Sequence, residues 1–172
     1  MGATGSNRSA RFKQSVCWQF FSDRVEPEPL VLGAASIGFA AFDFAPPENW
    51  PLILDNGLRV SAIRGHGTVT DGLNHRENHS RIEDELRSNI ELAGQNDIPV
   101  LICFSGNRGG LSDEEGIENT VEGLRKVAKL AEGRKVTLCI EMVNSKVGRP
   151  DYQADRTWWG VEVCKRVGSP AV

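Results

Sequence analysis

Apolar runs alternate with amphipathic stretches along this chain, which predicts strands and helices in turn. Runs rich in β-branched residues at 58–64, 99–105 and 135–140 are typical of buried parallel strands. Between them, apolar residues recur at helical spacing, as Ile82, Leu86 and Ile90 do. Two further runs, at 11–18 and 36–44, bring the expected strands to five.

Capping signals predict where the helices begin and end. Two Ser/Glu pairs have capping-box spacing, and a glycine follows each helical pattern. These residues are Ser80 with Glu83 before Gly94, and Ser112 with Glu115 before Gly133.

The remaining helices are predicted from single residues. Asp155 is expected to cap a last helix that stops at Gly168, and a short helix is expected to end near Gly57. Pro27 and Pro29 interrupt the segment after the first strand, so the pattern does not support a regular helix there.

Five strand–helix repeats with short connections predict an α/β fold built from right-handed βαβ units around a parallel sheet. At 172 residues the chain suits one domain, which we assign to residues 11–172 after a flexible tail at 1–10. The end of the chain, 168–172, is expected to form a turn and begin a sixth strand.

Composition limits the kinds of molecule that the protein is expected to bind and the cellular compartment in which it is expected to occur. A net charge of -3 without a Lys/Arg run argues against nucleic acid and favours small metabolites. The longest apolar stretch, 30–44, is interrupted and too short to span a membrane. Four widely spaced cysteines without a CxxC pair favour reduced residues in a cytoplasmic protein over a disulfide framework; they are Cys17, Cys103, Cys139 and Cys164.

The candidate functional residues lie where the predicted strands end. We expect them to be close together, because the loops that follow parallel strands share one edge of the sheet. Glu141 ends the fifth apolar run, where it could bind a hard divalent cation and act as a base on a carbon acid. It could equally face solvent or hold a structural cation. The residues expected at this edge are Asp43, His66, Ser105 to Arg108, Glu141 and Asn144.

Other polar features have competing interpretations. His66, His75 and His79 share a polar loop, but their spacing fits no compact zinc motif. The sequence FSGNRGG could hold an anion with help from Arg108, or it could be a plain turn between a strand and a helix. The pair Trp158-Trp159 could pack a helix or support a sugar.

Three long strings then carry a resemblance that runs from about Gly38 to the C-terminus. NGLRVSAIRGHGTVTDGLNHRENH, PVLICFSGNRGGLSDEEGIEN and VTLCIEMVNSKVGRPDYQADRTWWGVEVCKRVGSP together resemble the hydroxypyruvate isomerase family of xylose isomerase-like TIM barrels. The resemblance implies a metal-dependent aldose-ketose type isomerase of carbohydrate metabolism. Such an enzyme interconverts hydroxypyruvate and tartronate semialdehyde, or a related small sugar or keto acid, through an enediolate.

The resemblance also implies roles for individual residues. Glu141 matches the first of four ligands of a magnesium or manganese ion, and it is one of two carboxylates that move the proton. His66 and Asn144 match substrate-side positions. Asp43 stands where the family usually has a Glu, and we expect it to contact substrate. From its place in the Gly-rich loop, and not from the resemblance, we expect the same of Arg108.

This chain also departs from the family. The later ligands and the second acid/base have no counterpart before Val172, so we expect a partial (β/α)8 barrel of about five units. Its metal binding is expected to be weak or absent, and the isolated chain inactive. The alternative is a non-catalytic barrel that binds a partner or forms a homo-oligomer through its open edge. An abasic-site endonuclease needs a histidine cluster and a basic face, which this chain lacks.

Overall fold

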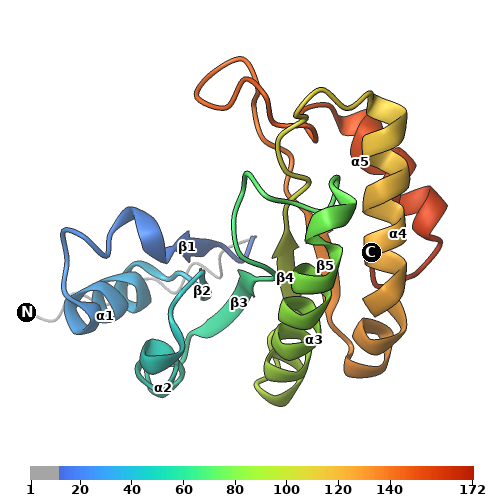
Figure 1. The fold of residues 1–172 in the computed structure, drawn as a ribbon. Coiled ribbons are helices and arrows are strands. Elements are labelled where there is room, and N and C mark those ends of the chain that lie inside the picture. The colour runs from blue at the N-terminus through green and yellow to red at the C-terminus, as the bar shows by residue number, and fades with distance from the viewer. Residues whose placement is uncertain (1–11) are drawn as a thin grey trace, which may run out of the picture. The chain divides into compact units, whose positions relative to one another are not determined.

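The structure is a computed structural model that describes residues 12–172, so the expected tail at 1–10 lies outside the described residues. It is an α/β fold, a partial TIM barrel, whose five strands are parallel and follow chain order from β1 to β5 (Figure 1). By packing, the chain divides into two compact units at Ser61 and Ala62. We call them the N-terminal and the C-terminal unit and describe each by itself.

The N-terminal unit holds two paired strands and two helices. Strands β1 (Ser15–Cys17) and β2 (Ala41–Asp43) pair in parallel, with Ser15 opposite Ala41. Helix α1 spans Pro27–Ile37 and helix α2 spans Trp50–Asp55. Two single-turn 3-10 helices, η1 (Trp18–Phe20) and η2 (Pro47–Asn49), complete the unit before β3 begins.

Helix α1 corrects the expectation that prolines prevent a helix in this segment. Pro27 is the first helical residue and Pro29 the third, so both lie in the first turn, where backbone N–H groups have no helical partner to lose. The helix runs to Ile37 and ends at Gly38, whose φ of 96° closes it. The strand predicted at 36–44 is therefore reduced to Ala41–Asp43.

The C-terminal unit repeats the order strand then helix three times. Strand β3 (Arg59–Arg64) pairs through its C-terminal half with β4 (Val100–Cys103), which pairs with β5 (Thr137–Ile140). Helices α3 (His79–Gln95), α4 (Asp113–Arg134) and α5 (Thr157–Val167) pack side by side along these strands (Figure 1). A 3-10 turn, η3 (Arg76–Asn78), leads into α3.

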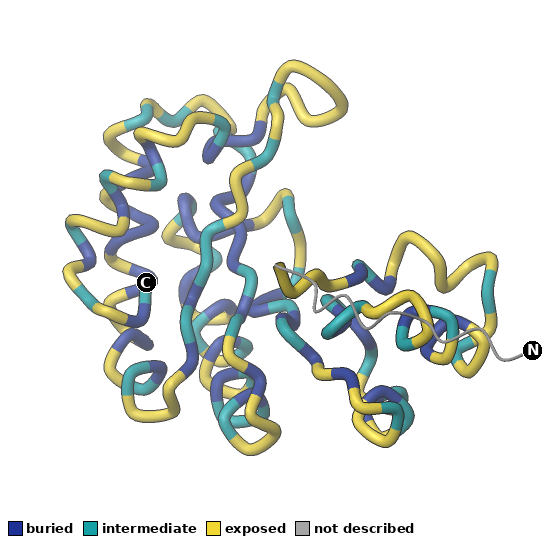
Figure 2. The backbone as a smooth tube through the Cα atoms, turned by 180° about the vertical axis from the view of Figure 1, so that it is seen from behind, coloured by how far each residue is buried: buried dark blue, intermediate teal, exposed yellow. Residues whose placement is uncertain are grey.

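The core of this unit lies between its helices and strands. Leu86 and Ile90 of α3, Leu124 and Val127 of α4, and Val163 of α5 are fully buried. Figure 2 shows the buried stretches along the strands and the inner sides of the helices, with exposed residues on the outer turns. The helical periodicity in the sequence therefore predicted the packed faces correctly.

Two of the three predicted helix caps are wrong. The Ser112–Glu115 capping box is confirmed: Ser112 Oγ accepts the Glu115 N–H at 3.2 Å, and Glu115 Oε2 accepts the Ser112 N–H at 2.9 Å. Ser80 instead lies inside α3, which starts at His79. Asp155 precedes α5 but caps nothing, because its carboxylate accepts hydrogen bonds from Ser145 and Arg108.

The last residues return to the sheet. Gly168 ends α5 with a φ of 69°, as predicted, and the Leu138 N–H of β5 then donates to the Ala171 carbonyl at 2.7 Å. That single bond lies where a sixth strand was expected to begin. None of the helices between residues 12 and 172 is long and apolar enough to cross a lipid bilayer.

Candidate functional site

Glu141 is the first residue after β5, and its side chain is exposed. Its backbone N–H donates to the Cys103 carbonyl of β4 at 2.9 Å, which continues the strand pairing by one residue. An exposed loop, residues 144–150, follows and projects from the top of this unit in Figure 1. Asn144 begins the loop, and its side-chain oxygen accepts the Lys146 N–H at 2.9 Å. A carboxylate and an amide thus face solvent at the carboxyl end of one strand.

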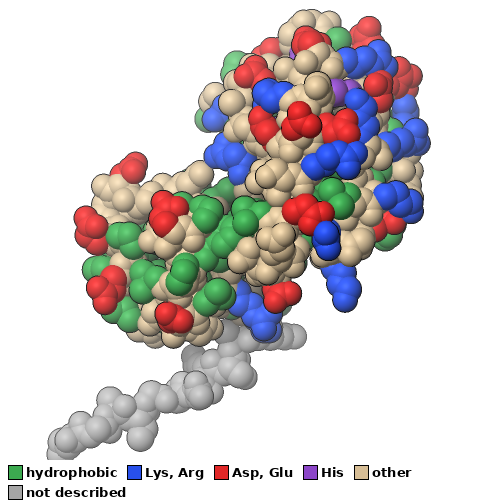
Figure 3. Space-filling view, turned by 60° about the horizontal axis from the view of Figure 1, so that its bottom comes forward, with side chains coloured by type: hydrophobic (Ala, Val, Ile, Leu, Met, Phe, Trp, Pro, Cys, Tyr) green, Lys and Arg blue, Asp and Glu red, His purple; other side chains and the backbone are tan. Residues whose placement is uncertain are grey.

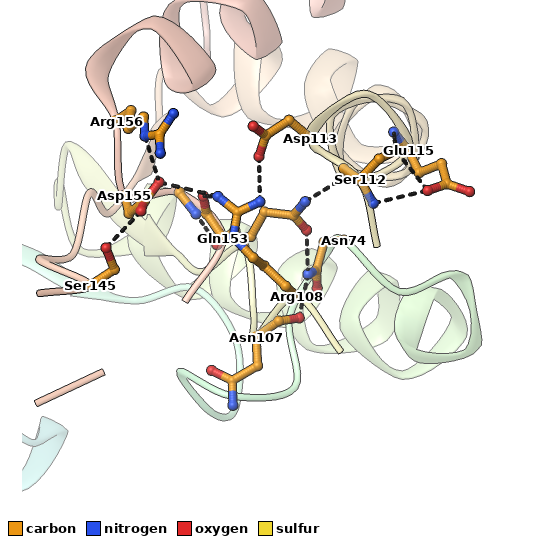
Figure 4. Close-up of polar contacts among 12 residues, drawn as sticks. Asn74, Asn107, Arg108, Ser112, Asp113, Glu115, Ser145, Gln153, Asp155 and Arg156 are labelled. Atoms are coloured by element: carbon orange, nitrogen blue, oxygen red, sulfur yellow. Dashed lines mark hydrogen bonds and ion pairs between the residues drawn. The ribbon is translucent and has the colours of Figure 1, made fainter. Parts of the chain in front are cut away.

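Beneath this exposed edge, Asn74 joins three loops of the C-terminal unit (Figure 4). Its side-chain Nδ2 donates to Gln153 Oε1 at 2.7 Å and to the Asn107 carbonyl at 2.5 Å. Its own carbonyl accepts the Asn119 side chain at 2.7 Å. Asn74 is fully buried, and nothing in its polar sequence surroundings distinguishes it from a solvated loop residue.

Gln153 is the second buried link of this network. Its Nε2 donates to the Ser112 carbonyl at the start of α4 (2.8 Å), and its backbone N–H donates to the Gly106 carbonyl (2.9 Å). A Cβ at Gly116 would lie 2.3 Å from the Gln153 amide, so only glycine admits this side chain against the helix. The loop after β5 is therefore fixed to the start of α4.

Arg108 lies within the same network, between two carboxylates (Figure 4). Its guanidinium contacts Asp113 at 2.5 Å and Asp155 at 3.3 Å, and it donates to the Gln153 carbonyl at 3.4 Å. Its backbone N–H donates to the Asp151 carbonyl at 2.6 Å. The structure thus places Arg108 in internal ion pairs, and its role as a substrate contact stays a prediction.

Two further N–H groups of the Gly-rich loop also have acceptors within the protein. The Asn107 N–H donates to the Thr70 carbonyl at 2.9 Å, and the Gly109 N–H donates to the Asp151 carboxylate at 3.1 Å. Because an anion cradle needs converging N–H groups that are free to bind a ligand, this geometry favours the plain turn.

His66 is buried just beyond the end of β3, with 1% of its surface exposed. Its Nε2 accepts the Phe104 N–H at 3.0 Å, so in the neutral ring the proton belongs on Nδ1. Burial lowers the pKa of His66 to about 4, against the opposing effect of the Glu85 carboxylate. Nδ1 is itself buried and has no hydrogen-bond partner among residues 12–172, so its N–H is an unsatisfied donor.

Asp43 belongs to the N-terminal unit, at the end of β2. Its two carboxylate oxygens accept hydrogen bonds from the Ser15 and Ser61 hydroxyls, each at 2.5 Å. These bonds hold the carboxylate between the neighbouring strands. Its predicted contact with substrate stays a prediction.

The remaining candidates serve the packing of the C-terminal unit. His75 donates to the Asn107 carbonyl at 3.1 Å and His79 to the Leu73 carbonyl at 2.9 Å, each through Nε2. Trp159 is buried, whereas Trp158 is half exposed. Within residues 12–172, no group of three or more His, Cys, Asp and Glu side chains is placed to hold a metal ion.

Comparison with known families identifies the fold. Residues 33–172 match the family model described as the xylose isomerase-like TIM barrel. The chain belongs to this family. A comparison with curated proteins gives no match.

Solved structures of this barrel type agree with that assignment. An AP endonuclease of family 2 from Brucella melitensis superposes with a TM-score of 0.75 at 18% identity, over 94% of this chain and 67% of that one. A D-psicose 3-epimerase from Clostridium cellulolyticum H10, crystallised with D-tagatose, gives 0.72 at 16% identity, over 94% of this chain and 62% of that one. At such identities the likeness shows the xylose isomerase-like fold alone, and the chain spans about two-thirds of these structures.

Proposed function

We propose that this xylose isomerase-like chain supplies Glu141 to the site of a divalent-metal-dependent isomerase of the hydroxypyruvate isomerase type. The substrate is a small sugar or keto acid. The supporting observation is that Glu141 presents an exposed carboxylate at the carboxyl end of β5, the end of the strands where barrel enzymes place their catalytic groups.

The chemistry suits a carboxylate in this position. A hydrogen on a carbon next to a carbonyl becomes acidic when a cation polarises that carbonyl, and a carboxylate within reach can take the proton and return it to the neighbouring carbon. Magnesium and manganese prefer oxygen ligands, and magnesium usually binds one or two carboxylates together with its substrate and water. Glu141 fits as one such ligand, and the other ligands are not supplied by a cluster within residues 12–172.

The proposal assigns supporting roles to the other candidates. In this proposal Asn144, which is exposed three residues after Glu141, contacts substrate. The Nδ1 donor of His66 is buried and would have to become accessible before it could do so. Asp43 and Arg108 are already engaged by protein groups, so a contact with substrate would require them to exchange partners. Glu141 therefore carries the proposal.

The test is to compare the wild type with Glu141→Gln in two assays. We expect Mn²⁺ binding, measured by electron paramagnetic resonance, to be lost in the variant. The second assay measures isomerisation of hydroxypyruvate with Mg²⁺ or Mn²⁺ present. We expect turnover by Glu141→Gln to be about 100-fold or more below that of the wild type, because the variant cannot transfer the proton.

The matched control is Glu48→Gln, which removes an exposed carboxylate from the N-terminal unit and should change neither result. Equal Mn²⁺ affinity in the wild type and Glu141→Gln would contradict the proposal. Cleavage of abasic-site DNA by the same samples would favour the nuclease alternative.

A second candidate function, self-association, is favoured by an apolar groove in the N-terminal unit. The groove has a volume of about 510 Å³ and runs between β1 and α1. Phe20 and Ile37 line it and are 74% and 76% exposed. Strand β1 is the first of the five strands in the sheet order.

We assign this groove to a second copy of the chain, because exposed apolar side chains of two copies can cover one another across a two-fold axis. Ile37→Lys is expected to convert a dimer to a monomer in analytical ultracentrifugation. Val147→Lys, which changes an equally exposed residue of the C-terminal unit (76%), should leave the dimer intact. A wild-type monomer at high concentration would contradict this assignment.

A further inference from the structure

Both peptide groups that flank the Cα of Glu141 are held, although the strand has already ended. Its N–H donates to the Cys103 carbonyl at 2.9 Å, as a continuation of the β4–β5 pairing. Its carbonyl has no strand partner and instead accepts the Tyr152 hydroxyl at 3.0 Å. With both groups fixed, the backbone at Glu141 has one orientation, and so does the Cα–Cβ bond from which its side chain extends.

The hydroxyl of Tyr152 also binds the end of β4. It accepts the Ser105 N–H at 3.1 Å, so one oxygen links the ends of two neighbouring strands. Tyr152 is fully buried, and burial raises the pKa of its phenol. The hydroxyl therefore keeps its proton at neutral pH and remains a donor to Glu141.

Backbone bonds on both sides of Tyr152 hold the ring in place. The Asp151 carbonyl accepts the Arg108 N–H at 2.6 Å, and the Gln153 N–H donates to the Gly106 carbonyl at 2.9 Å. The Ala154 N–H donates to the Ser105 hydroxyl at 3.0 Å. The position of the phenol is thus set by the loop after β4 and not by Glu141 itself.

We propose that Tyr152 is a positioning residue for Glu141, which fixes the direction in which its side chain leaves the backbone by binding its backbone carbonyl. This inference rests on the proposed function, since it assumes that the carboxylate binds a metal ion. Removing the hydroxyl leaves the Glu141 carbonyl and the Ser105 N–H without partners and frees the peptide after Glu141 to rotate. A ligand whose direction is no longer fixed binds metal more weakly.

The test uses Tyr152→Phe, which keeps the buried ring and removes only the hydroxyl. Thr120→Val is the matched control: it removes a buried hydroxyl of α4 that has no hydrogen-bond partner within residues 12–172, and it leaves the Tyr152 to Glu141 bond intact. Two quantities are measured on the full chain: hydrogen exchange of the Glu141 amide without metal, and the Mn²⁺ dissociation constant by electron paramagnetic resonance.

We expect Tyr152→Phe to speed exchange of the Glu141 amide and to weaken Mn²⁺ binding by about 10-fold, the lower end of the effect of groups that orient metal ligands. Thr120→Val is expected to leave both quantities near the wild-type values. Equal changes in the two variants, or no change in Tyr152→Phe, would overturn the inference while leaving the proposed function in place. If the wild type does not bind Mn²⁺, the proposed function fails, and the exchange rates alone decide whether Tyr152 orders Glu141.

Discussion

Helix α4 of the C-terminal unit and helix α1 of the N-terminal unit cover their apolar residues to different extents. The buried side of α4 includes Ile117, Leu124 and Val127, each at most 1% exposed. Helix α1 buries Leu30 and Val31 but leaves other apolar residues in solvent; these are Leu32 at 49% and Ile37 at 76% exposed. The apolar residues of α4 are thus covered by the rest of its unit, whereas α1 leaves apolar surface exposed to solvent.

This difference separates two kinds of function in one chain. In the C-terminal unit, packed helices and loops joined by hydrogen bonds form a support from which the Glu141 side chain extends. In the N-terminal unit, apolar side chains remain accessible, and Figure 3 shows hydrophobic side chains gathered over that unit while charged side chains dominate the other. A rigid support suits a catalytic group, whereas an apolar surface suits contact with another polypeptide.

The largest expected loss of stability comes from Leu124→Ala in α4. Leu124 is fully buried, so the change leaves a cavity and should lower the free energy of unfolding by about 3 kcal/mol. Urea unfolding measures the loss, and hydrogen exchange of amides in α3 and α4 assigns it to the C-terminal unit.

Leu32→Ala is the matched change in α1, where the same atoms are removed from a half-exposed side chain. We expect it to alter stability by less than about 0.5 kcal/mol. Similar losses in the two variants would show that α1 is covered in solution, and the contrast between the helices would then be wrong.

A somewhat smaller loss of stability is expected when the pH is lowered and histidines take up protons. All three histidines lie in the C-terminal unit. The pKa of His66 is lowered to about 4 from its ordinary 6.5, chiefly by burial. Between these values the unfolded chain takes up a proton that the folded chain does not bind. Stability therefore falls as the pH falls through this window, by roughly 2 to 3 kcal/mol between pH 7.5 and 4.5.

The measurement is urea unfolding at both pH values for the wild type and His66→Asn. In the variant, the difference in stability between the two pH values should shrink by that amount. His75→Asn, which alters a partly exposed histidine of the same unit, should retain the wild-type difference. An unchanged difference in His66→Asn would show that the ring is accessible to protons in the folded chain.

Local patterns predicted most of the fold. The spacing of Ile82, Leu86 and Ile90 predicted the buried face of α3, and the Ser112–Glu115 pair predicted the start of α4. The errors arose where one signal has two structural outcomes. Pro27 and Pro29 break a helix interior but are tolerated in its first turn. Ser80 has capping-box spacing to Glu83, yet the chain is already helical at His79.

The candidate site was predicted only in part. The end of an apolar run placed Glu141 at the end of β5, because strand boundaries are local. Asn74, Tyr152 and Gln153 were missed, since their partners lie 11 to 79 residues away and each stands in an unremarkable polar or mixed segment. The predicted single domain and the substrate contacts stay predictions.

The loop at 144–150 is anchored at its base by the bond from the Val143 N–H to the Ala154 carbonyl at 3.1 Å and by the Tyr152 bond to Glu141. Chain length between these anchors can change at small cost, because lengthening an exposed loop adds little closure entropy. Insertions and deletions at 144–150 can therefore accumulate among descendants of this sequence without altering the aim of the carboxylate. Proteins of this kind can therefore differ in substrate preference through the loop at 144–150 while they keep Glu141.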